Sequence, residues 1–181
     1  SAILREYLTR AAEDLDGFSV APVVFFHFDG PLDLDAIEAR DTSRSADAAV
    51  ALVDVDATSP EKGTFYPLAL RATSRDMRYV RKGTLAVAPL AGFVLRPNTL
   101  YAAVLRRSFG GAPGGLTTSL DLEAVLAKTP RTDPASEHAR ALHAPAVEAL
   151  EGLGIARADI ASLAVFRTGR PHATLVRLVD E

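Results

Sequence analysis

The stretch Leu-Arg-Pro-Asn-Thr-Leu-Tyr-Ala-Ala-Val-Leu, residues 95–105, decides how the rest of the chain is interpreted. Pro97 has a fixed φ and no amide hydrogen to donate, so residues 96–98 are typical of a turn. The residues that follow alternate along the chain, which predicts a β-strand with two distinct faces. Leu100, Ala102 and Val104 share one face, and Tyr101, Ala103 and Leu105 share the other.

The spacing of Leu95, Pro97 and Tyr101 resembles the tyrosine corner of immunoglobulin-like (Ig-like) β-sandwiches. In that corner, a tyrosine near the start of a strand bonds through its hydroxyl to backbone a few residues upstream. Tyr101 is the tyrosine at that position, and Pro97 belongs to the turn before it. An ordinary half-buried strand after a proline turn is the alternative. The motif concerns the fold and carries no chemistry.

Length and composition indicate one globular domain over residues 1–181. The chain is 48% hydrophobic, which suits a domain with a sizeable core. The net charge of −3 gives no basic surface for nucleic acid, so no nucleic-acid partner is expected. The absence of cysteine excludes disulfides and thiolate metal sites. The longest apolar stretch, residues 21–28, is too short to cross a bilayer.

Short strands separated by turn residues roughly every 8–12 positions are the dominant pattern, and they predict a mainly β chain arranged as a sandwich. Val24, Phe26 and Phe28 share one face of the segment 20–28, and we place all three in the core. Because this segment is apolar on both faces, we expect it in the middle of a sandwich and not at an edge. The other expected strands cover residues 49–56, 64–71, 77–80, 84–89, 163–167 and 173–179.

Helical segments interrupt this pattern at three places. Apolar spacing predicts a short N-terminal helix over residues 3–15 that stops at Gly17, and one helical turn over 33–39. A helical insertion is expected at about 116–154, between two strands of one sheet. Ser119 caps its first helix, Asp133 caps the next, and Pro145 should divide that helix in two.

Ser19 is the candidate nucleophile that the sequence offers. The segment Gly17-Phe18-Ser19-Val20-Ala21 is one residue short of the α/β-hydrolase pentapeptide, because alanine replaces its last glycine. That motif needs a strand before the serine and a helix after it, whereas here the order of the expected elements is reversed. We therefore interpret Ser19 as a turn or capping hydroxyl and predict no catalytic residue.

Histidines and aspartates are the remaining groups with possible chemistry. His138 and His143 are five residues apart and so do not share a helix face, and His27 lies in a phenylalanine-rich strand. No cofactor or metal site is predicted from the histidines. Three acidic pairs leave calcium as an alternative, but solvated loop carboxylates are the preferred interpretation. These pairs are Asp14/Asp16, Asp33/Asp35 and Asp54/Asp56, and the last pair is expected to face outward. The glycine-rich segment 110–115 lacks the lysine of a phosphate-binding loop and is interpreted as a linker.

Several short motifs resemble the N-terminal Ig-like domain of bacterial extracellular lipases of the virulence-factor type, and related bacterial surface Ig-like domains. Leu15-Asp16-Gly17-Phe18-Ser19 is similar to the segment before the first strand of that domain, and residues 28–33, Phe-Asp-Gly-Pro-Leu-Asp, are similar to its next turn. The Leu95–Tyr101 corner and the closing segment Val165-Phe166-Arg167-Thr168 complete the match. In those lipases the catalytic serine lies in a downstream domain, so the resemblance carries no catalytic residue over to this chain.

The resemblance implies a non-catalytic accessory or interaction module of a secreted or surface-anchored bacterial protein. It implies a downstream lipase- or esterase-like hydrolase domain, or a surface protein, as partner. The implied location is extracellular or at the cell surface, with the periplasm as an alternative. The competing hypothesis is a self-contained small hydrolase or ligand-binding enzyme with a site between sandwich and helices. Ser, His and Asp side chains within hydrogen-bonding reach in one pocket would favour that enzyme.

Overall fold

The structure is a computed structural model that describes residues 2–30, 40–41, 44–109 and 115–172. These residues form two small antiparallel sheets and three α-helices, a β-rich mixed α/β architecture. Two further expectations, the helical turn at 33–39 and the strand at 173–179, lie outside the described residues. The elements are α1 (Ala2–Asp14), β1 (Val24–His27), β2 (Arg40–Asp41), β3 (Val50–Asp54), β4 (Leu68–Thr73), β5 (Thr84–Pro89), β6 (Leu100–Arg106), α2 (Leu120–Leu126), α3 (Pro134–Gly152) and β7 (Ile160–Arg167).

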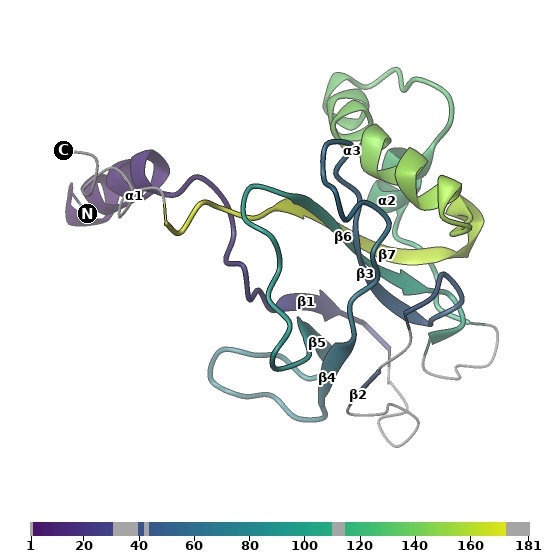
Figure 1. The fold of residues 1–181 in the computed structure, drawn as a ribbon, viewed down its shortest axis with the longest axis horizontal. Coiled ribbons are helices and arrows are strands. Elements are labelled where there is room, and N and C mark those ends of the chain that lie inside the picture. The colour runs from purple at the N-terminus through teal and green to yellow at the C-terminus, as the bar shows by residue number, and fades with distance from the viewer. Residues whose placement is uncertain (1, 31–39, 42–43, 110–114, 173–181) are drawn as a thin grey trace.

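The two sheets interleave along the chain, because β3 belongs to a different sheet from its sequence neighbours β2 and β4. One sheet has the order β1-β5-β4-β2 and the other has the order β3-β6-β7 (Figure 1). The helices α2 and α3 lie between β6 and β7 in sequence, yet β6 and β7 are antiparallel neighbours in the sheet. The predicted placement of a helical segment between two strands of one sheet is therefore confirmed.

A hydrophobic cluster containing residues of both sheets forms the larger core. Phe26, Leu85 and Val87 enter it from the four-stranded sheet, and Leu52, Tyr101 and Leu105 enter it from the three-stranded sheet. This assignment confirms the predicted face for Tyr101, Ala103 and Leu105 on β6. Phe28 is half-buried against the same cluster, so both phenylalanines predicted to lie in the core contribute to it.

The other face of the three-stranded sheet is covered by helices (Figure 1). Ala146 and Leu150 of α3 pack against Val53 of β3 and Val104 of β6. Strand β3 is consequently buried at every position, because one of its faces meets the first cluster and the other meets α3. Asp133 caps α3 by accepting the Ser136 N–H over 2.7 Å, as predicted.

The prediction that Pro145 divides this helix is wrong. Helix α3 continues from Pro134 to Gly152 with Pro145 inside it. A proline removes one backbone hydrogen bond and crowds the preceding turn. Packing of the residues just after it, Ala146, Val147 and Leu150, holds the helix together across this defect.

The expected central position of β1 is also wrong, because β1 lies at an edge and pairs with β5 alone among the described strands. The two apolar faces of β1 differ in burial: Phe26 is buried, whereas Phe25 is 61% exposed on the opposite face. The predicted strand at 77–80 is absent as well. Residues 74–83 form the turn between β4 and β5, in which Met77 N–H donates to Val80 O over 2.8 Å.

Helix α1 stands clear of both sheets (Figure 1). It covers residues 2–14, close to the predicted 3–15. Its large apolar side chains Ile3, Tyr7 and Leu8 are all exposed. These side chains give α1 an exposed apolar face, which is considered with the functional surfaces below.

Candidate functional site

The tyrosine corner has the predicted geometry. Tyr101 is fully buried, and its hydroxyl accepts the Arg96 N–H over 2.9 Å, five residues upstream. Burial raises the pKa of the Tyr101 phenol. The ring stacks on Phe166 and meets the edge of Tyr66. Pro97 lies within the turn, and its carbonyl accepts the Thr99 hydroxyl over 2.9 Å.

We expect Tyr101→Phe to lower the free energy of unfolding by about 1 kcal/mol or more, because the Arg96 amide then loses its acceptor. The fold should be retained, since the ring keeps its packing. Urea denaturation followed by circular dichroism measures the change, with Tyr79→Phe at an exposed tyrosine as the control. An unchanged midpoint for Tyr101→Phe would show that this bond does not stabilise the protein.

A second set of backbone hydrogen bonds joins residues 16–18 to residues 167–169 near this corner. Phe18 N–H donates to Arg167 O, and Gly169 N–H donates to Phe18 O, so Phe18 and Thr168 form an isolated parallel bridge. We call residues 16–18 and 168–170 around this bridge the strap. A Cβ at Gly17 would lie 2.5 Å from the Gly169 nitrogen. Gly17 is therefore needed for close approach of two backbones rather than as the helix stop that the sequence suggested.

Thr168 connects this strap to the proline turn. Its buried hydroxyl donates to Arg96 O and accepts the Thr99 N–H over 3.0 Å. Sequence reasoning did not single out Thr168, because its partners lie about seventy positions away and no local pattern marks them. The polypeptide thus enters and leaves the body of the protein at the corner.

Exposed apolar side chains are concentrated in residues 3–25, which we call the N-terminal apolar surface. They occur on α1, in the strap and on β1, and Phe18, for example, is 64% exposed although its ring contacts Phe166. Contiguous exposed apolar groups mark surfaces that contact other molecules or domains. The members are Ile3, Leu4, Tyr7, Leu8, Leu15, Phe18, Val23 and Phe25.

The expected outward orientation of Asp54 and Asp56 is wrong, because both carboxylates are buried. Asp54 accepts the Asp56 N–H over 2.9 Å and the Ser59 hydroxyl. Asp56 accepts hydrogen bonds from Thr58, from the Leu100 N–H and from Arg167. Protein donors therefore occupy the oxygens that were considered for calcium.

The electrostatics of Asp56 follow from these contacts. Burial by itself raises the pKa of the Asp56 carboxyl, but the hydrogen bonds outweigh it and lower the pKa from 3.8 to about 2. The strongest charge partner is Arg167, whose Nη1 lies 2.7 Å from the Asp56 Oδ2 and which also donates to Asn98 O. This network ties the end of β3 to the proline turn and to β7.

A pH dependence of stability follows from the depressed pKa of Asp56. The ionised group stabilises the fold fully above the unfolded pKa of 3.8, and this contribution is lost as the pH falls toward about 2. The difference corresponds to about 2 kcal/mol. We expect the loss of stability between pH 5 and pH 2 to be smaller in Asp56→Asn by this amount. Urea denaturation at both pH values measures it, and Asp47→Asn, at an exposed aspartate, should retain the full wild-type loss.

The remaining candidates from the sequence do not come together. Ser19 accepts the Ala21 N–H over 3.1 Å, which confirms its interpretation as a turn hydroxyl. His143 contacts Ala139 O through Nδ1 over 2.8 Å, and His138 and His172 are exposed. Within the described ranges, no group of three His, Cys, Asp or Glu side chains is placed to hold a metal ion. The pair Asp33/Asp35 and the segment 110–114 lie outside those ranges.

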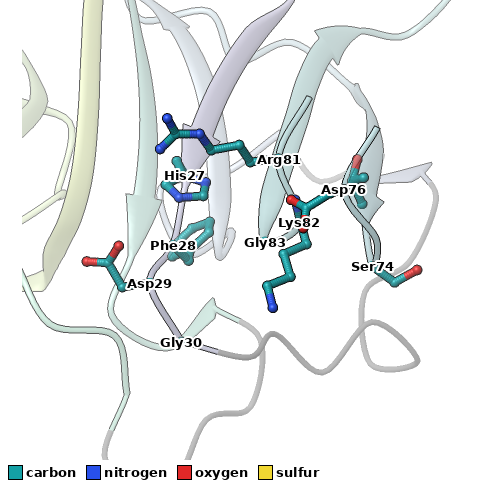
Figure 2. Close-up of a pocket in the computed structure, with 10 residues that line it drawn as sticks. His27, Phe28, Asp29, Gly30, Ser74, Asp76, Arg81, Lys82 and Gly83 are labelled. Atoms are coloured by element: carbon teal, nitrogen blue, oxygen red, sulfur yellow. The ribbon is translucent and has the colours of Figure 1, made fainter. Parts of the chain in front are cut away.

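A pocket of about 520 Å³ lies where β1 and β4 end and β5 begins (Figure 2). His27, Ser74, Asp76, Arg81 and Lys82 are among its lining residues. His27 contacts the Thr84 hydroxyl through Nδ1 over 3.4 Å. Among the residues described, no hydrogen bond joins His27 to Ser74 or to Asp76. The described lining residues of the pocket therefore do not form the connected Ser, His and Asp that would favour the enzyme hypothesis.

Comparison of the chain with protein-family models, with curated proteins and with solved structures finds no match. Of the helices in the part of the chain that is described, none is long and apolar enough to cross a membrane.

Proposed function

We propose that this chain is a non-catalytic accessory or interaction module with an Ig-like β-sandwich fold. The fold assignment is supported by the Tyr101–Arg96 bond of a tyrosine corner and by the core cluster to which both sheets contribute. It agrees with the resemblance to the N-terminal domain of bacterial extracellular lipases. The corresponding location is extracellular or at the cell surface of a bacterium.

The N-terminal apolar surface is the observation that carries the interaction role. Eight large apolar side chains between Ile3 and Phe25 are exposed, although burying such a side chain stabilises by roughly 1.5–3 kcal/mol. The surface adjoins the strap formed by residues 16–18 and 168–170, where the chain enters and leaves the body. A neighbouring domain of the same polypeptide, joined at this end, is well placed to cover it. We propose a lipase- or esterase-like hydrolase domain as that neighbour.

Hydrogen exchange in the natural gene product that contains this chain tests the proposal. Amides of α1 should exchange more slowly in that protein than in the isolated chain, because a neighbouring domain covers them. Leu8→Gln should remove the protection, whereas Glu6→Gln, which lies about 160° around the helix from Leu8, should leave it unchanged. Equal exchange in the two proteins, or a gene product without a further domain, would overturn the proposed role.

The purified chain is expected to show no esterase activity of its own. Short- and long-chain nitrophenyl esters are the test substrates, because the competing hypothesis is a self-contained hydrolase. Ser19→Ala, Ser74→Ala and His27→Ala are the diagnostic variants. Turnover above background that any of these substitutions abolishes would replace the accessory role with an enzymatic one.

A further inference from the structure

The walls of the pocket in Figure 2 are held by backbone hydrogen bonds at Gly83. Gly83 N–H donates to Thr73 O over 2.8 Å, and Phe28 N–H donates to Gly83 O over 2.9 Å. Gly83 has a φ of 74°, and a Cβ there would lie 2.7 Å from Phe28 O. The end of β1 and the turn between β4 and β5 are therefore fixed against each other, with the pocket beside them.

The turn that carries the charged residues of the pocket is ordered by its own hydrogen bonds. The Asp76 carboxylate accepts the Lys82 N–H over 3.0 Å, and Met77 N–H donates to Val80 O over 2.8 Å. Asp76 is consequently engaged with the backbone of the turn. Arg81 and Lys82 follow directly and project from a defined backbone.

The cationic groups of the pocket have no anionic partner among the described residues. Neither Arg81 nor Lys82 forms an ion pair with any residue in the described ranges. In Figure 2 the Arg81 side chain points toward His27, and the Lys82 side chain points toward the end of the described segment at Gly30. The Asp29 carboxylate points away from Lys82. The pocket thus presents two cations outside any ion pair among the described residues, in a lining that also contains His27 and the carboxylates of Asp29 and Asp76.

We propose that this pocket binds a compact oxyanion, the phosphate or carboxylate group of a small molecule. Arginine offers a planar fork of N–H donors that matches either group, and lysine adds a point charge. The Ser74 hydroxyl at the rim supplies a neutral donor. His27 supplies another through Nε2 in the tautomer whose Nδ1 accepts the Thr84 hydroxyl proton. This role is independent of the N-terminal apolar surface and adds a ligand site to the module.

Titration of the folded chain with inorganic phosphate and with acetate tests the site, at constant ionic strength maintained with chloride. Backbone amide shifts in nuclear magnetic resonance spectra report the binding, and saturable shifts should appear at Gly83 and His27. Arg81→Gln and Lys82→Gln should each weaken binding about tenfold, as expected for loss of a charge-assisted contact. The tighter of the two anions identifies the ligand group as phosphate or carboxylate.

Arg78→Gln is the matched control, because Arg78 lies in the same turn but its guanidinium lies over the Tyr79 ring, 5.2 Å from the ring centroid. This variant should bind the anion like the parent. Arg81 and Lys82 are exposed, so thermal melting of both variants should match the parent and exclude unfolding as the cause. Chemical shifts that never saturate, or an equal loss of binding in Arg78→Gln, would overturn the proposal. The shifts would then reflect nonspecific screening of surface charge and not binding at a site.

Discussion

Replacing Phe26 with alanine is expected to lower the free energy of unfolding by about 3–5 kcal/mol, the usual range for loss of a buried ring. Phe26 is only 5% exposed and pairs with Leu85 across β1 and β5. Phe26 is the one buried side chain of this edge strand, and it lies in the core cluster to which both sheets contribute. Urea denaturation followed by circular dichroism gives the change in stability, provided that the slope with urea is unchanged.

The neighbouring Phe25 provides the control for this prediction. Phe25→Ala removes the same ring from the same strand, but on the exposed face, and should change stability by less than about 0.5 kcal/mol. A loss below about 1 kcal/mol for Phe26→Ala would mean that β1 can leave the sheet without disturbing the core. In the accessory role proposed for the chain, Phe25→Ala instead affects contact with the neighbouring domain.

Alternation along the sequence predicted β6 well because β6 is the middle strand of its sheet. Both of its faces are buried, and each face has a different covering layer. The tyrosine corner was predictable for a related reason, since Tyr101 and Arg96 are only five positions apart. Local spacing alone determines which backbone group the phenol can reach.

The same pattern failed at β1 and β3 because alternation does not reveal what lies on the far side of a strand. Phe25 is apolar yet exposed, so its hydrophobicity gave β1 the appearance of a central strand. Asp54 and Asp56 are charged yet buried, and the donors that make this tolerable include Leu100 and Arg167, which are 44 and 111 positions from Asp56. Partners at such separations are set by the tertiary fold.

The pocket was not predictable for a similar reason. Its lining comes from the end of β1 and from both sides of the turn between β4 and β5, and the β1–β5 register brings these segments together. Arg81 and Lys82 are adjacent in the sequence, but no local pattern relates them to His27. The turn at Gly83 places both residues in the pocket that His27 also lines. The sequence alone does not reveal which backbone segment a glycine such as Gly83 approaches.

Gly17→Ala is expected to open the strap between the two ends of the described chain. The added Cβ would lie 2.5 Å from the Gly169 nitrogen and 2.6 Å from the Thr168 carbonyl carbon, and backbone atoms cannot move aside as a flexible side chain can. The Phe18–Arg167 and Gly169–Phe18 hydrogen bonds should be lost, at a cost of about 2 kcal/mol or more.

Hydrogen exchange at the Phe18 and Gly169 amides measures the opening directly, because both amides donate across the strap. They should lose protection in Gly17→Ala, while the Val53 and Val104 amides in the centre of the three-stranded sheet keep theirs. Gly152→Ala is the control, since a Cβ at Gly152 meets no atom within 4 Å. Retained protection at Phe18 and Gly169 in Gly17→Ala would show that the two segments can separate slightly without losing their bonds. The glycine would then be dispensable for the way in which α1 is held at the corner.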